Sequence, residues 1–155
     1  MTKFFLVLHV LAAIIAIGPV TVAASMFPAA ARRAMADGPD AASLASVRLL
    51  HRVCVVYAVF GLAVPAFGFA TASSLGVLGD AWLVASILLT AAAAGVLALL
   101  VLPRQSAILA GLGGAGEPVE RSATARLAMM TGVFNLLWAV VTILMIVRPG
   151  STTGA

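Results

Sequence analysis

Four long runs of apolar residues, separated by short polar segments, organise this chain. None of the runs contains an Asp, Glu, Lys or Arg, and they cover residues 4–31, 53–79, 81–103 and 127–147. A helix rises about 1.5 Å per residue and the apolar layer of a bilayer is roughly 30 Å thick, so about 20 apolar residues cross it. Backbone groups in lipid must form hydrogen bonds within their own segment, which favours helices. The pattern therefore predicts a bundle of four transmembrane helices.

The composition indicates a membrane protein rather than a water-soluble one. Hydrophobic residues make up 63% of the 155 residues and charged residues only 9%, whereas soluble domains are closer to about a quarter charged. We expect an all-α fold that forms one domain over residues 1–155, embedded in the lipid bilayer, with a flexible tail at 150–155. The spans are placed at approximately residues 4–28, 53–72, 82–102 and 127–147.

Basic residues are distributed unevenly between the two ends of the predicted spans. The connections at residues 32–52 and 104–126 hold seven arginines, and the opposite end has only Lys3 and Arg148. Connections rich in Lys and Arg stay in the cytoplasm, so both connections are predicted to be cytoplasmic and both termini to lie outside. Because orientation in the membrane accounts for the net charge of +4, no nucleic acid partner is expected. The second helix is predicted to begin near Ala41, and the connection at 104–126 to be flexible because it is rich in glycine.

Small and polar residues recur at spacings of three and four along the spans, which places each set on one helical face. Membrane helices approach one another through such faces. The predicted inward faces are His9, Ala12, Ala16, Pro19, Ala23 and Met26 on the first span; His51, Cys54, Ala58, Gly61, Pro65 and Gly68 on the second; Ala91, Ala94, Gly95 and Ala98 on the third; and Thr131, Asn135, Trp138, Thr142 and Met145 on the fourth. The fourth face is the most polar. Pro19 and Pro65 are expected to kink their helices, because proline lacks the backbone donor.

His9 is the only imidazole, acid or base set well inside a predicted span. Ionisable groups in the membrane often mark functional sites. Counted along the helices, Ser86, Thr142 and Met145 fall at a similar depth. His9 and Met145 are therefore candidate ligands of haem or copper. In the alternative interpretation, His9 is neutral and forms a hydrogen bond with a hydroxyl or a carbonyl, which holds two helices together.

The second histidine, His51, lies at the cytoplasmic mouth of the second predicted span. The chain crosses the bilayer between His9 and His51, so a single iron cannot bind both within one chain. His51 and Cys54 lie three positions apart on one face and offer half of a site for a soft metal, but zinc usually has four ligands. An interfacial role for His51 is the simpler interpretation.

No sequence pattern for catalysis or covalent cofactor attachment accompanies these residues. The chain has no GxxxxGK, HExxH, CxxC or CxxCH pattern and no paired carboxylates within the spans, which are the common signatures of nucleotide, zinc, redox and haem chemistry. We therefore predict no enzymatic activity, no catalytic residue and no resident cofactor. Haem or copper at His9 is kept as the alternative.

The segment LHVLAAIIAIGP, residues Leu8–Pro19, resembles the first span of a broad bacterial group of membrane proteins. That group includes the membrane part of copper-resistance protein D and small four-span proteins of unknown function. Residues His9, Ala12, Ala13 and Gly18 match its pattern, and the pair Gly18-Pro19 is closer to the small four-span proteins. The arginine-rich entry to the second span and the LPRQ segment at Leu102–Gln105 are also similar. The resemblance implies a four-helix integral membrane fold, in the plasma (inner) membrane of a bacterium.

The leading functional hypothesis is a non-enzymatic membrane protein that works through partners. It acts as an accessory or structural subunit of a membrane complex, or as a homo-oligomer, because small-residue faces favour helix association. One alternative is a haem- or copper-binding membrane protein with its site around His9. The other is a small transporter lined by His9, Thr131 and Asn135.

Overall fold

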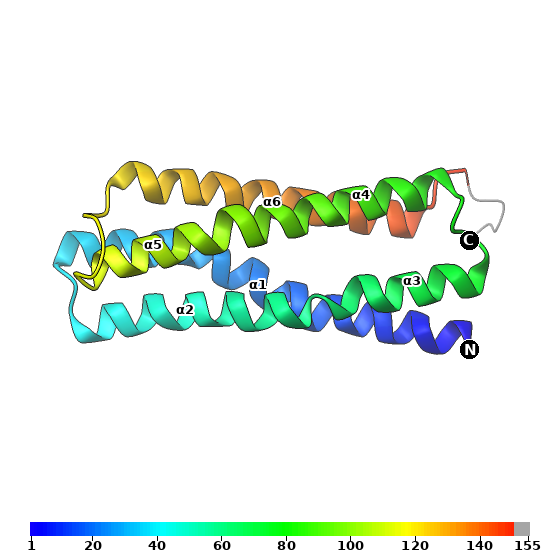
Figure 1. Cartoon of the computed structure of the whole chain (residues 1–155), viewed down its shortest axis with the longest axis horizontal. Coiled ribbons are helices and arrows are strands. Elements are labelled where there is room, and N and C mark those ends of the chain that lie inside the picture. The colour runs from blue at the N-terminus through cyan, green and yellow to red at the C-terminus, as the bar shows by residue number, and fades with distance from the viewer. Residues whose placement is uncertain (151–155) are drawn as a thin grey trace.

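A computed structural model of the chain describes residues 1–150, and every regular element in that part is helical (Figure 1). The elements are α1 (Thr2–Asp37), α2 (Ala41–Phe60), α3 (Ala63–Leu75), α4 (Ala81–Gly95), the π-helical segment η1 (Val96–Val101), α5 (Leu102–Leu112) and α6 (Arg121–Val147). They form four rods that are long and apolar enough to cross a membrane, namely α1, α2 with α3, α4 through α5, and α6. The predicted four-helix membrane bundle is confirmed. The tail predicted to be flexible lies outside the described residues, except for Gly150.

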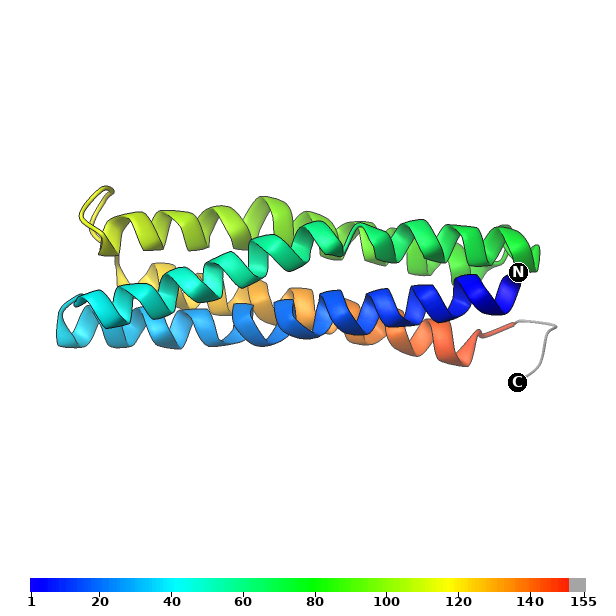
Figure 2. The same ribbon diagram turned by 90° about the horizontal axis from the view of Figure 1, so that it is seen from below.

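The two ends of the bundle differ in what they carry. The start of α1 and the end of α6 lie at one end, and the α1–α2 and α5–α6 connections lie at the other (Figures 1 and 2). We call these the terminal end and the basic end, because the seven arginines of residues 32–52 and 104–126 lie in these connections or in the adjoining halves of the rods. That the basic end faces the cytoplasm stays a prediction of the charge distribution.

The helices extend well beyond the predicted spans at the basic end. α1 continues to Asp37, α2 begins at Ala41 as predicted, and α5 reaches Leu112 inside the connection expected to be flexible. These extensions are rich in Ala, Leu and Arg, which favour helix. They also pack on one another, since the apolar side chains Ala34, Val47, Ile108 and Leu112 are buried there. The bundle therefore continues past the apolar run that the sequence pattern marks.

Two prolines set the irregular points of the rods. Pro65 has no N–H for the carbonyl of Gly61, and that oxygen instead accepts from the Val64 N–H at 3.1 Å. This is the predicted break, between α2 and α3. Pro103 follows η1, in which the Leu102 N–H reaches back five residues to the carbonyl of Leu97; the wider turn makes room before the proline ring. Pro19, by contrast, lies inside the unbroken α1.

The packed interior consists of two clusters. The larger one joins all four rods in the middle and toward the basic end, and its bulkiest members are Phe27, Leu97, Ile108, Leu112, Leu127 and Phe134. The smaller one, at the terminal end, consists of Ala72, Val77, Trp82 and Leu83, with Met145 packed against it. Many large apolar side chains outside these clusters are exposed, among them Phe4, Phe69 and Ile146, as suits a surface in contact with lipid.

All four predicted inward faces are wrong in part, and on the second and fourth rods the exposed members are Pro65 and Thr142. Met26 is 54% exposed, and α1 instead buries the neighbouring Phe27. On the third rod Ala91, Ala94 and Ala98 are exposed, while Ala93 and Leu97 point inward. Lipid is as apolar as Leu, so the inward face of an all-apolar helix is decided by fit and not by hydrophobicity.

Candidate functional site

His9 packs where the second rod is broken. Its Nδ1 lies 2.9 Å from the carbonyl oxygen of Val64, at the start of α3. The ring rests on Gly68, because a Cβ at that position would lie 2.9 Å from His9 Cε1. Gly68 therefore lets α1 and α3 approach closely, and the hydrogen bond ties the two helices. This contact corresponds to the interpretation in which His9 bonds a carbonyl of another helix.

The other members of the predicted His9 cluster make different contacts. Ser86 Oγ donates to the carbonyl of Trp82 at 2.8 Å, and Thr142 Oγ1 donates to the carbonyl of Trp138 at 2.9 Å. Both hydroxyls thus bond to their own helices, and Met145 packs against the cluster around Trp82. Within residues 1–150 no hydrogen bond joins His9 to any of these side chains. The structure does not join the expected site through hydrogen bonds.

The tautomer of His9 follows from its partner. A carbonyl oxygen only accepts, so Nδ1 carries the proton. In the neutral imidazole Nε2 is then left with its lone pair, which is the arrangement usual for metal-binding histidines. Across the described residues no group of three or more His, Cys, Asp or Glu side chains is arranged to hold a metal. His9 is thus an available nitrogen without a preformed ligand set around it.

A second cluster of polar side chains lies at the basic end, between α2 and α5. His51 Nδ1 lies 3.0 Å from Gln105 Oε1, and His51 Nε2 lies 3.2 Å from Ser106 Oγ. Gln105 Nε2 donates to Cys54 Sγ at 3.6 Å. Gln105 and Cys54 are both fully buried, whereas Ser106 is exposed. We call His51, Cys54, Gln105 and Ser106 the His51 cluster.

The His51 cluster opens onto a groove at the surface. The groove has a volume of about 350 Å³ and is lined by Arg48, His51, Ser106, Leu109, Ala110, Gly113 and Ala115. Arg48 precedes His51 by one helical turn, so both side chains lie on the same face of α2. Sequence reasoning placed His51 at the interface but missed Gln105 and Ser106, because they lie more than 50 positions away along the chain.

The polar face predicted on α6 is only partly used inside the chain. Thr131 is buried, with 2% of its surface exposed, and Asn135 Nδ2 donates to Ser25 Oγ on α1 at 3.1 Å. Among the described residues, Thr131 Oγ1, Asn135 Oδ1 and Trp138 Nε1 have no hydrogen-bond partner. Thr142 lies on the exposed side of the helix. Asn135 thus links α6 to α1, and its unpaired Oδ1 is buried inside the chain.

Gly61, the other glycine predicted for packing, serves the break in the second rod. A Cβ there would lie 3.0 Å from the carbonyl oxygen of Ala58, and the Gly61 N–H donates to the carbonyl of Tyr57 at 2.8 Å. The residue therefore accommodates a tight backbone turn. Gly61 and Gly68 act locally, one at the break and one under the His9 ring.

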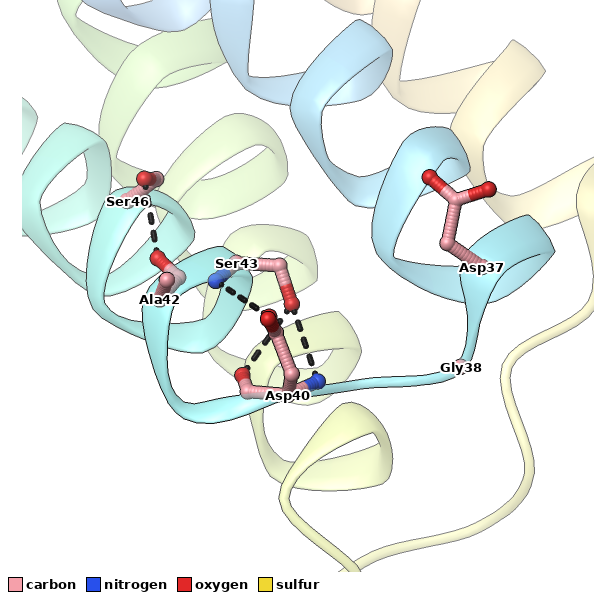
Figure 3. A pocket seen from close by; sticks show the side chains of 6 residues that line it. All are labelled: Asp37, Gly38, Asp40, Ala42, Ser43 and Ser46. Atoms are coloured by element: carbon pink, nitrogen blue, oxygen red, sulfur yellow. Dashed lines mark hydrogen bonds between the residues drawn. The ribbon is translucent and has the colours of Figure 1, made fainter.

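The α1–α2 connection is a tight polar turn at the basic end (Figure 3). Asp40 caps α2: Oδ1 accepts from the Ser43 N–H at 2.7 Å, and the Asp40 N–H donates to Ser43 Oγ at 3.1 Å. This reciprocal pair is a capping box. The hydrogen bonds from Ser43 lower the pKa of the Asp40 carboxyl below its ordinary value. The hollow beside the turn is lined by this cap and by Asp37, so it holds no cationic side chain.

Comparison with known proteins adds no family to this description. No protein-family model, no curated protein and no solved structure matches the chain.

Proposed function

We propose that this chain is a non-enzymatic membrane protein that works by associating with other membrane helices, first of all with a second copy of itself. The single observation that carries the proposal is an exposed row of small residues along α6. Ala125, Ala128, Gly132 and Ala139 are all exposed, and the partly buried Asn135 falls in the same row. Their spacings of three and four give one continuous strip along the helix.

Small residues on a lipid-facing surface have a specific physical use. Apolar side chains gain nothing by leaving lipid for another helix, so association depends on close packing and interhelical hydrogen bonds. A Cβ at Gly132 would meet nothing within 4 Å, so this glycine is not required by packing inside the chain. A backbone from another helix has room to approach there.

The other half of the exposed surface of α6 is different. Met129 is 58% exposed, Val133 42% and Leu136 65%, and these side chains are typical of a surface that faces lipid. α6 therefore presents two strips, one small and one large. Asn135 falls in the small strip, and its unpaired Oδ1 is buried inside the chain, so the strip offers a surface for close packing and not a free polar atom.

Disulfide cross-linking in membranes tests the proposal. Ala128→Cys places a thiol in the small strip, and Val133→Cys places one in the large strip of the same helix. The native Cys54 is fully buried and is common to both variants. We expect covalent dimers from Ala128→Cys and none from Val133→Cys. Equal cross-linking of both, or of neither, would contradict the proposed interface.

Binding of haem or copper at His9 is a second candidate, supported by the free Nε2 lone pair described above. His9 Nδ1 is held by Val64 at 2.9 Å, which fixes the ring for a ligand at Nε2. Protein from cells supplied with both haem and copper is the material to examine. A Soret band or stoichiometric copper that His9→Ala removes would support this candidate. If the wild-type protein shows neither a Soret band nor stoichiometric copper, this candidate is excluded.

A further inference from the structure

We propose that the groove over the His51 cluster binds a phosphate group, presented either by an anionic phospholipid or as free phosphate. The inference is independent of self-association through α6, because the groove lies between α2 and α5. The polar side chains that line it are Arg48, His51 and Ser106. No carboxylate lines it. These groups are a permanently charged guanidinium, an imidazole and a hydroxyl, and together they favour the binding of an anion.

Gln105 holds the His51 imidazole in place from the buried side of the ring. Gln105 has no exposed surface, and both ends of its amide are engaged: Oε1 with His51 at 3.0 Å and Nε2 with Cys54 at 3.6 Å. Because this amide oxygen accepts, Nδ1 of His51 carries a proton. The ring is therefore fixed with Nε2 directed at Ser106 and the groove.

The hydrogen bond between His51 and Ser106 has two forms, which differ in the donor that reaches the groove. When His51 is neutral, Ser106 donates its O–H to Nε2, at 3.2 Å. When His51 is charged, Nε2–H is a donor and the Ser106 O–H is released to a third acceptor. Arg48, one turn away, adds guanidinium donors that suit the geometry of phosphate oxygens. With a charged His51, a phosphate thus meets two donor groups, the Ser106 O–H and the Arg48 guanidinium, while the imidazole Nε2–H donates to Ser106 and contributes its positive charge.

The place of the groove in the bundle suits a lipid headgroup. It lies where α2 leaves the predicted apolar span, beside the arginines of the basic end. Its remaining lining is apolar and small, formed by Leu109, Ala110, Gly113 and Ala115, and can accommodate the glycerol part of a lipid. Basic pockets at this level are known to receive anionic headgroups.

The chain offers a matched pair of variants. Arg48→Gln removes a charge that lines the groove, and Arg52→Gln removes the same charge one residue beyond His51, outside that lining. Both arginines are exposed, so neither change disturbs the core. Ser106→Ala tests the hydroxyl without altering charge.

Native mass spectrometry of protein released from phosphatidylcholine nanodiscs, with and without phosphatidylglycerol, counts the retained anionic lipid. A parallel arm titrates inorganic phosphate into protein in phosphatidylcholine alone. We expect retention by the wild type and by Arg52→Gln, and about tenfold weaker binding by Arg48→Gln and Ser106→Ala, from the loss of a charge-assisted hydrogen bond.

Each outcome decides a separate point. Retained phosphatidylglycerol without phosphate binding assigns the site to a lipid, and saturable binding of inorganic phosphate assigns it to the free anion. Equal loss in Arg48→Gln and Arg52→Gln would mean that only the overall charge matters, and would overturn the site. Binding of neither ligand by the wild-type protein would overturn it as well.

Discussion

The contact between His9 and Gly68 predicts that the effect of Gly68→Ala on the free energy of unfolding depends on the residue at position 9. The substitution should destabilise the protein when His9 is present and should not when it is absent. An alanine Cβ at position 68 would lie 2.9 Å from His9 Cε1, which is too close for an undisturbed structure. The ring cannot simply move aside, because its Nδ1 is bonded to Val64 at 2.9 Å. Gly68→Ala therefore either breaks that hydrogen bond or separates α1 from α3.

The magnitude follows from opposing contributions. Losing the hydrogen bond costs about 0.5–1.5 kcal/mol, and overpacking costs roughly 1–3 kcal/mol. Replacing glycine by alanine inside a helix contributes about 0.5–1 kcal/mol in the other direction. The net effect expected for Gly68→Ala is a destabilisation of up to about 1 kcal/mol if the hydrogen bond breaks, and of up to about 2.5 kcal/mol if the helices separate, from these same contributions.

The assay is a double-mutant cycle measured by reversible unfolding in mixed micelles. In the His9→Ala background the clash is absent, so Gly68→Ala should be neutral or stabilising by up to about 1 kcal/mol. Gly18→Ala is the control, since a Cβ there meets nothing within 4 Å. If Gly68→Ala had the same effect with and without the His9 ring, the proposed close packing of α1 on α3 would be refuted.

Three further predictions concern the two ends of the bundle. Gln105→Leu leaves the buried side of His51 unpaired and should lower the free energy of unfolding by about 1–3 kcal/mol, measured by the same unfolding assay. Arg148→Gln removes a cation 5.6 Å from the centre of the Trp82 ring and should cost about 0.5–1 kcal/mol, with no further loss when Trp82 is already replaced by Leu. Asp40 has a pKa lowered from 3.8 in the folded state, so its stabilising effect is complete above that value and is lost as the pH falls through the lowered folded pKa. Asp40→Asn should flatten this acid-dependent part of the thermal midpoint, and an unchanged pH profile would show that the capping carboxylate does not contribute.

The number of crossings was predictable from sequence, and the facing of the helices was not. Lipid imposes a minimum apolar length and intrasegment hydrogen bonds, so the uncharged runs are enough to identify four rods. No comparable sequence pattern shows which side of each rod is buried. Ala94 and Ala98 are exposed while Leu97 is buried, because a Leu is equally at home in lipid and in the bundle.

The two histidines show the same limit at the level of sites. The partner of His9 is a backbone carbonyl, of Val64, and any residue could have supplied it. The partner of His51 is Gln105, which lies beyond the predicted end of the third span. It comes next to His51 because α5 continues the third rod past that end. Cys54 was paired with His51 by spacing, and the structure instead places Gln105 between them.

Counting subunits in a bilayer tests self-association through α6 most directly. Single-molecule photobleaching of labelled protein, at increasing dilution in phosphatidylcholine vesicles, gives the fraction of pairs for the wild type, for Gly132→Leu and for Ala66→Leu, a control at an exposed small residue of α3. We predict pairs for the wild type and Ala66→Leu, and single subunits for Gly132→Leu. Single subunits for the wild type at every dilution, or undiminished pairing of Gly132→Leu, would contradict the proposal.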